Sequence, residues 1–331
     1  YICISFLNLK HMINRRSLRV KVLQLLFSYY SQAVLKEDKK KLQQEISKQL
    51  NQSILDIEKS YFEIISLLIV LKNINEEKKE IANKELIKKS TSRFNLSDNR
   101  IINFLEKNTQ IIDGLIKHKN GWNTKTEKIR NWYNVLLQEE FYKNYIKIEK
   151  PTFEEDFDFL QNLTVKFLFK DNDIQKSFEE ENIFWNEDFL IVKSMIKKTL
   201  KTLNSSNFNT FATASLSEDI KEDVKFACSL FDCVIDNSTE YDDHISIFAK
   251  NWHLERISLM DRTILRMGIG EMVNFSNIPV KVSINECIDI AKNYSSPKSG
   301  KFINGLLDVI SLNLLKEKKI IKTGKGLIDN K

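Results

Sequence analysis

Residues 254–315 contain three amphipathic helical segments separated by two short breaks, and each break contains a proline. Within each segment apolar residues recur at i, i+3, i+4 and i+7, the spacing that gives a helix one apolar face. Pro279 and Pro297 each precede a segment, where proline is tolerated because the first N–H groups of a helix have no internal partner. This stretch therefore predicts three helices joined by short turns, forming a compact all-α unit.

The remainder of the chain is also expected to be helical. Only 8 glycines and 3 prolines occur among 331 residues, too few for the turns that sheets and phosphate-binding loops require. Apolar residues at helical spacing mark 54–74, 95–112, 129–148, 153–169 and 185–200. The stretch 36–48 is a charged lead-in, and 78–89 is charged and expected to be solvated. The formal net charge of +6 is too small to predict a nucleic-acid ligand without considering where the charges lie.

The first predicted helix has an unusual charge distribution. Asn14 is a candidate cap for a helix that continues to about Gln32, and three arginines occupy its first two turns: Arg15, Arg16 and Arg19. Cations at this positive end of a helix dipole each cost some tenths of a kcal/mol. The arginines are therefore either a solvated basic end or a surface that contacts phosphates.

No pattern for catalysis or metal binding withstands inspection. The four cysteines (Cys3, Cys228, Cys233, Cys287) contain no C-x-x-C pair, and the four histidines are scattered. The run around Gly300 is close to a phosphate-binding loop. However, Ser295 occupies the position of the required first glycine, and Phe302 replaces the Ser or Thr. We therefore expect neither enzymatic activity nor a cofactor. No apolar run approaches the ~20 residues that cross a bilayer.

Two runs in the C-terminal part carry a family resemblance: 278–286 (IPVKVSINE) and 301–308 (KFINGLLD). With Asp261, Arg262 and Glu271 they resemble the C-terminal half of the NusB family, and 22–30 (VLQLLFSYY) resembles its first helix. The resemblance implies a NusB-like helical bundle with a large helical insertion after the first helix, similar to a longer form of the family.

The resulting domain prediction has five parts. Residues 1–11, which precede Met12, are expected to be a non-native upstream segment. The first, arginine-rich helix covers 12–35, the helical insertion 36–217 and the NusB-like bundle 218–318. A basic flexible tail is expected over 319–331.

The resemblance also implies a function, that of a cytoplasmic transcription antitermination factor without enzymatic activity. Such a protein would bind boxA-like single-stranded RNA together with NusE, a ribosomal small-subunit protein, in the RNA polymerase antitermination complex. The implied RNA-binding residues are Arg15, Arg16, Arg19, Lys298, Lys301, Phe302 and Asn304. The implied partner-binding residues are Phe27, Asp261 and Glu271.

The sequence departs from the family pattern at three of these positions and at the neighbouring Gly300. Phe27 replaces a tyrosine, and Asp261 is one methylene shorter than the usual glutamate. Lys298 stands where an acidic residue is common, and Gly300 where a histidine is common. Two alternatives remain open. One is a structural helical protein with a degenerate RNA site. The other is an RNA-binding module related to the N-terminal domain of RNA cytosine methyltransferases.

Overall fold

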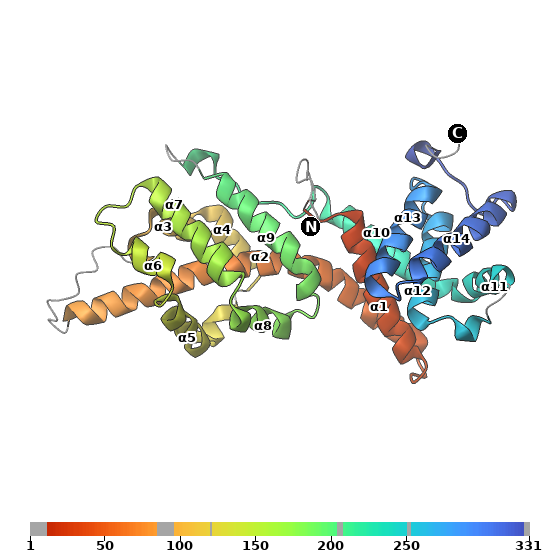
Figure 1. The fold of residues 1–331 in the computed structure, drawn as a ribbon, viewed down its shortest axis with the longest axis horizontal. Coiled ribbons are helices and arrows are strands. Elements are labelled where there is room, and N and C mark those ends of the chain that lie inside the picture. Colours follow the sequence, from red (N-terminus) through yellow and green to blue (C-terminus); the bar gives the residue numbers. More distant parts are fainter. Residues whose placement is uncertain (1–11, 85–95, 120, 204–207, 250–252, 328–331) are drawn as a thin grey trace. The chain divides into compact units, whose positions relative to one another are not determined.

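The computed structural model describes residues 12–84, 96–119, 121–203, 208–249 and 253–327. In these ranges all regular structure is helical, which confirms the predicted all-α class (Figure 1). No helix in the same ranges is both long and apolar enough to cross a membrane. The 1–11 segment and Cys3 lie outside the described residues.

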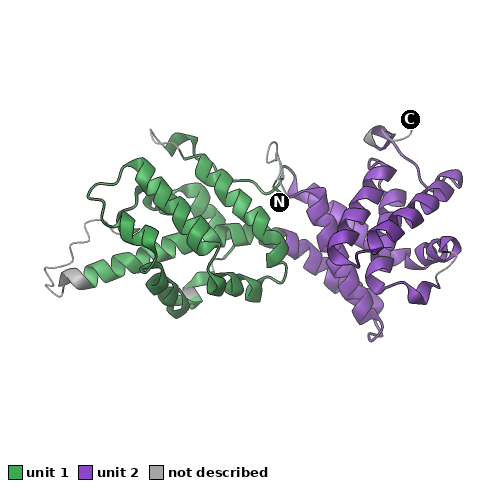
Figure 2. Ribbon diagram, viewed as in Figure 1, with its two compact units in different colours: residues 1–12, 55–218 green, residues 13–54, 219–331 purple. Residues whose placement is uncertain are grey.

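The chain divides into two compact units, coloured separately in Figure 2. One unit contains residues 13–54 and 219–331, and we call it the bundle unit. The other contains 55–218, together with residues 1–12, and we call it the inserted unit. Helix α2 (Lys39–Lys84) contributes residues to both units. Residues 39–54 therefore belong to the same unit as the first helix.

Six further helices complete the bundle unit: α1 (Arg15–Ala33), α10 (Ile220–Asp236), α11 (Ser238–Phe248), α12 (Leu259–Asn274), α13 (Val280–Tyr294) and α14 (Ser299–Lys316). Asn14 caps α1 as predicted, because its side chain accepts a hydrogen bond from the Ser17 amide at 2.8 Å. The expected helix from residue 254 begins later, at Leu259. The Ser258 hydroxyl caps it by accepting from the Asp261 amide, and a 3-10 turn precedes it.

Helix α12 is the centre of the bundle unit, since it packs against α1, α10, α11, α13 and α14. Every residue from Thr263 to Met272 is buried. Gly268 allows side chains of α13 and α14 to pack closely against α12, as the glycines in this helix predicted. A Cβ on this residue would lie 2.9 Å from Cys287 Sγ and 3.0 Å from a Leu307 methyl. Cys287 is accordingly buried, whereas Cys228 and Cys233 are half-buried.

The inserted unit is built around the second part of α2. No glycine or proline interrupts residues 39–84, so the charged stretches expected to be separate continue the same helix. Most of its apolar positions between 54 and 74 are buried, as the periodicity predicted. The other helices of this unit are α3 (Arg100–Lys107), α4 (Thr109–Lys117), α5 (Thr126–Leu136), α6 (Glu140–Tyr145), α7 (Phe153–Asn162), α8 (Asn172–Glu181) and α9 (Trp185–Lys201).

Two helices expected in the inserted unit differ from the structure. The stretch 129–148 is divided into α5 and α6, because the chain turns between Leu136 and Glu140. The stretch 153–169 begins as α7 but continues as a π-helix over Leu163–Leu168. Within it the Phe169 amide donates to the Thr164 carbonyl, five residues back, at 3.0 Å.

The beginning of the expected flexible tail is packed against the bundle unit. Ile320 is buried, and the Lys322 ammonium donates to the carbonyls of Met272 and Phe275 at 2.8 and 2.9 Å. These carbonyls lie at the C-terminal end of α12, where a helix lacks internal donors and favours a cation. The sequence pattern did not indicate this interaction.

The close packing at α12 predicts opposite effects for two Gly→Ala substitutions. Gly268→Ala should lower the free energy of unfolding by about 1 kcal/mol, because overpacking outweighs the gain in helix propensity. Gly305→Ala is the matched control, since nothing lies within 4 Å of a Cβ there. It should raise the same quantity by about 1 kcal/mol. Hydrogen exchange of α12 amides in the full chain measures both, and stabilisation by Gly268→Ala would contradict the packing described.

Candidate nucleic-acid interface

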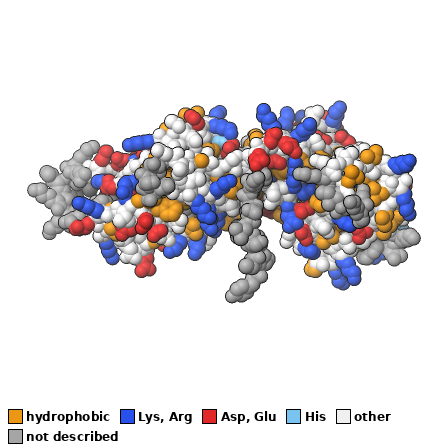
Figure 3. All heavy atoms as spheres, turned by 90° about the horizontal axis from the view of Figure 1, so that it is seen from above, with side chains coloured by type: hydrophobic (Ala, Val, Ile, Leu, Met, Phe, Trp, Pro, Cys, Tyr) orange, Lys and Arg blue, Asp and Glu red, His pale blue; other side chains and the backbone are white. Residues whose placement is uncertain are grey.

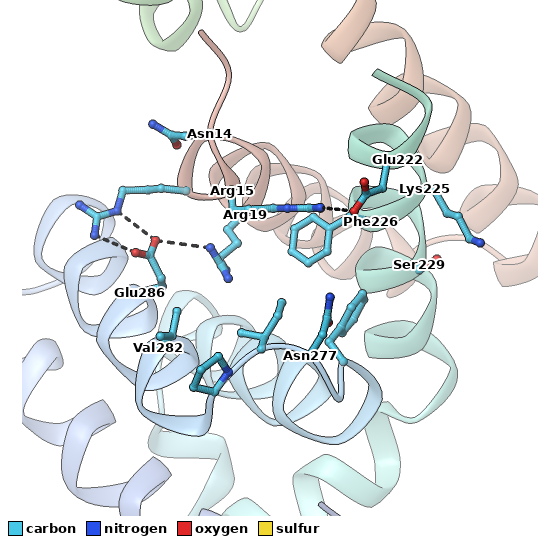
Figure 4. Close-up of a pocket in the computed structure, with 14 residues that line it drawn as sticks. Asn14, Arg15, Arg19, Glu222, Lys225, Phe226, Ser229, Asn277, Val282 and Glu286 are labelled. Atoms are coloured by element: carbon cyan, nitrogen blue, oxygen red, sulfur yellow. Dashed lines mark hydrogen bonds and ion pairs between the residues drawn. The ribbon is translucent and has the colours of Figure 1, made fainter. Parts of the chain in front are cut away.

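The N-terminal end of α1 borders an open groove of about 840 Å³ in the bundle unit (Figure 4). The walls come from the first turns of α1, from α10, and from the turn between α12 and α13 with the start of α13. The cationic side chains that line it are Arg15, Arg16, Arg19 and Lys225. The apolar ones are Phe226, Phe275, Ile278, Pro279 and Val282. Glu222 and Glu286 also line it, so the groove combines arginines and carboxylates with an apolar wall.

Arg15 contacts both a carboxylate and an aromatic ring on α10. Its Nη2 atom donates to Glu222 Oε1 at 2.9 Å, and its guanidinium carbon lies 4.3 Å from the centre of the Phe226 ring. Its buried Nη1 atom has no hydrogen-bond acceptor among the described residues, and Asp223 Oδ1 is 3.9 Å away. Arg15 is thus paired with carboxylates on α10 and stacked on the Phe226 ring.

Arg16 projects to the other side of α1, towards α13. Its Nε and Nη2 atoms form two parallel bonds to the Glu286 carboxylate at 3.0 and 2.9 Å, and Nη2 also donates to Asp289 at 2.9 Å. The hydrogen bond to Glu286 is the main cause that raises the pKa of Arg16. The side chain nevertheless remains 49% exposed, so an anion in solvent can reach it.

Arg19 was expected to contact RNA, but the structure places it in the interior rather than at the surface. Its side chain is 4% exposed and bonds in bidentate fashion to the Glu271 carboxylate at 2.6 and 3.0 Å. Glu271, expected at the partner-binding surface, is equally buried and also accepts from the Ser283 hydroxyl at 2.6 Å. The physical reason is mutual compensation, because a buried charge is tolerated when it is paired and hydrogen-bonded.

This buried pair predicts a stability effect rather than a direct binding effect. Arg19→Ala should lower the free energy of unfolding by about 3–5 kcal/mol, since it leaves Glu271 buried without a cation. Arg19→Met combined with Glu271→Gln should cost clearly less, because no charge is then buried and Ser283 keeps an acceptor. Denaturant unfolding of both variants, monitored by hydrogen exchange of amides in α1 and α12, measures the two losses of unfolding free energy. Equal losses would contradict the assignment.

The lysine–phenylalanine turn at the start of α14 does not line the groove. Lys298 and Lys301 are exposed, and Phe302 and Asn304 are half-buried. The ring of Phe302 therefore presents only part of its surface to solvent. The turn itself is held by Asp261, whose two carboxylate oxygens accept from the hydroxyls of Ser295 and Ser299 at 2.6 and 3.0 Å.

Helix α13 connects the two predicted RNA-binding stretches. Asp289 accepts from Arg16 at 2.9 Å and from Lys292 at 3.0 Å, and these donors lower its pKa, Lys292 having the larger effect. A Cβ on Gly300 would lie 3.5 Å from Lys292 Cγ, so the first turn of α14 packs on this same turn of α13. Side chains from opposite ends of the chain therefore flank one helix.

The residues expected to bind a protein partner do not form one cluster. Phe27 is exposed at 36% on α1, three helical turns beyond Arg16. Asp261 is half-buried and bonded to the two serines of the α14 turn. With Glu271 buried, only Phe27 presents a large side chain to solvent.

Sequence reasoning missed the carboxylates that neutralise the arginines. Glu286 and Asp289 follow each other at i and i+3 on α13, a spacing that places both on one face. This spacing was available as a signal, but only the fold brings the face beside α1. In the view of Figure 3, Lys and Arg side chains are interspersed with Asp and Glu over much of the visible face. A basic residue alone therefore does not mark an RNA contact.

Comparisons with known proteins support the family resemblance. A model of the NusB family matches residues 190–311. The chain is 38% identical over 128 residues to the transcription antitermination protein NusB of Dictyoglomus thermophilum, covering 39% of this chain and 88% of that protein. The chain belongs to the NusB family.

Two other relatives with the same name as the Dictyoglomus protein extend this finding. Identity is 42% over 122 residues with the Chloroherpeton thalassium protein and 45% over 103 residues with the Salinibacter ruber protein. These alignments cover 36% and 31% of this chain, but only 57% and 64% of the two relatives. A solved structure of T. maritima NusB is 28% identical, covers 44% of this chain and 86% of that one, and gives a TM-score of 0.29.

Proposed function

We propose that this protein is a cytoplasmic transcription antitermination factor that binds boxA-like single-stranded RNA together with NusE. In this role it would hold the RNA on the elongating RNA polymerase complex by binding alone, without catalysis. The observation that carries the proposal is the meeting of two distant stretches on α13. Arg16 of α1 and Lys292 of α13 share Asp289, beside the first turn of α14.

Single-stranded RNA is bound by cations that contact phosphates and by flat side chains on which bases stack. Arg15, Arg16, Lys298 and Lys301 supply the cations, and the half-buried Phe302 supplies a ring. Phe27 remains our candidate for contact with NusE, because its ring is exposed on α1. Asp261 would contribute mainly by holding the α14 turn.

Substitution of Arg16 provides a direct test of the RNA surface. Binding of a boxA-containing ribosomal-leader RNA, with and without NusE, should weaken with salt at a slope near −0.7 per neutralised phosphate. Arg16→Ala should weaken binding and make this slope shallower by roughly 0.7. Fluorescence anisotropy at salt concentrations from about 50 to about 300 mM, which bracket the physiological value, measures the affinity and its salt slope.

Arg130→Ala is the matched control for this experiment. Arg130 lies in the inserted unit with 50% exposure, and it is ion-paired to Glu77 at 2.9 Å. The variant removes the same charge from a similarly exposed pair, and it should leave affinity and slope unchanged. Equal effects of the two substitutions, or no effect of Arg16→Ala, would refute the proposed surface.

The carboxylates on α13 predict a gain of affinity. Glu286 must release Arg16 before a phosphate can take its place, so Glu286→Gln should strengthen RNA binding. A gain of about 5-fold is expected if the lost competition is worth about 1 kcal/mol, as for a partly exposed ion pair. The same anisotropy assay measures this change. Unchanged or weaker binding would show that Arg16 does not exchange a carboxylate for phosphate.

A further inference from the structure

Three lysines of the inserted unit lie close to one another. Lys193 and Lys197 lie one turn apart on α9, and Lys170 follows the π-helix. Among the described residues no carboxylate lies within ion-pair distance of these three ammonium groups, which we call the lysine cluster. Asp171, adjacent to Lys170, instead caps α8 by accepting from the amides of Asp173 and Ile174. This differs from Arg15 and Arg16, which are paired.

The cluster is unfavourable within the isolated protein. Like charges one helical turn apart repel each other. Burial lowers the pKa of Lys193, and the charges of Lys197 and Lys170 lower it further. The ammonium group of Lys193 therefore lies in a positive surrounding that disfavours its charge. An anionic ligand would relieve this repulsion.

Aromatic and apolar surface adjoins the same lysines. The Lys193 ammonium lies 5.4 Å from the centre of the Phe189 ring and 5.8 Å from that of Phe169. The two rings meet edge to face, with centres 5.4 Å apart. Phe189 is half-buried, and the neighbouring Leu190 is 67% exposed. Cations beside an accessible ring provide both contacts that a single strand of nucleic acid uses.

The π-helix contributes to this arrangement. Phe169 and Lys170 follow it directly, and the Phe169 amide donates to the Thr164 carbonyl five residues back. The Thr164 hydroxyl donates to the Leu160 carbonyl at 2.7 Å and is fully buried, which fixes the irregular turn. Irregular turns of this kind occur frequently at functional sites.

We propose that the lysine cluster, with Phe189 and Leu190, is a second RNA-binding surface that contacts single-stranded RNA with little sequence preference. It rests on the proposed function only in taking RNA as the ligand. The cluster would hold RNA outside the boxA-like element, adding affinity for longer transcripts. Phosphates would contact the lysines, and a base would pack on Phe189 and Leu190.

The test uses the full chain with two labelled RNAs, a 30-nucleotide oligouridylate and a short boxA RNA of about 12 nucleotides. The triple variant Lys170→Gln, Lys193→Gln, Lys197→Gln should weaken oligouridylate binding about tenfold or more. It should make the salt slope shallower by about 2, roughly 0.7 for each lost phosphate contact. Binding of the short boxA RNA should change by less than about twofold, because it is assigned to the bundle unit.

A second triple variant controls for net charge. Lys143→Gln, Lys147→Gln and Lys150→Gln remove the same charge from exposed positions of the same unit. This variant should leave oligouridylate binding and its slope unchanged. Equal losses in both triple variants, or no loss in the first, would overturn the proposal. Should the first triple variant fold poorly by circular dichroism, Lys197→Glu alone, at an exposed position, should still weaken binding several-fold.

Two further measurements separate the alternatives. Phe189→Leu should weaken oligouridylate binding about fivefold or more, since stacking on an aromatic ring is lost. If vesicles containing phosphatidylglycerol bind the protein through the cluster while oligouridylate binding does not depend on it, the RNA assignment is overturned. If only the bundle-unit proposal is wrong, Arg16→Ala will not affect boxA binding, whereas the cluster variant will still lose oligouridylate binding.

Discussion

The buried ion pair between Arg19 and Glu271 is the interaction on which the bundle unit depends. It fastens α1 to α12, and Ser283 extends the same hydrogen-bonded cluster to α13. Arg15 and Arg16 flank this anchor on the first turn of α1. Their positions along the groove are therefore set by Arg19, whose own side chain is almost fully buried. Arg19 was expected to contact RNA, but its ion pair instead fixes the position of the helix end that carries Arg15 and Arg16.

The same anchoring explains how a large insertion is compatible with the family fold. Helix α1 packs against α10 and α12, although residues 55–218 form a separate compact unit between them in the chain. Closing a longer connection costs little, about 0.6 kcal/mol for each doubling of its length. The buried contacts of α1 outweigh such a cost. An insertion that buries its own core adds a unit without dismantling the bundle.

Much of this fold was predictable from the sequence, whereas the partners of its charged residues were not. Apolar periodicity and the placement of Pro279 predicted the helices of the bundle, because both are local properties. Arg19 and Glu271 have polar side chains that are usually exposed, and only tertiary packing brings them together. The length of α2 was also missed. Its charged ends read as solvated segments, yet nothing in 39–84 interrupts a helix.

The two candidate surfaces differ in how their charges are balanced. The arginines of α1 have carboxylate partners that a ligand must displace, so a ligand there needs contacts beyond its charge. The lysine cluster of the inserted unit has no such partners among the described residues and therefore suits sequence-tolerant contact. A chain with both surfaces can combine a selective site with a general one. Linking two such contacts strengthens overall binding through effective concentration.

Ultraviolet crosslinking of the full chain to a boxA-containing leader RNA, followed by mass spectrometry, tests this account most directly. We expect crosslinked peptides from the first turn of α1 and from residues 298–304 with the short RNA. With a longer RNA, peptides around Phe189 should be added. Crosslinks confined to other helices, with none in the first turn of α1 or in residues 298–304, would contradict the central claim that RNA is held beside α13.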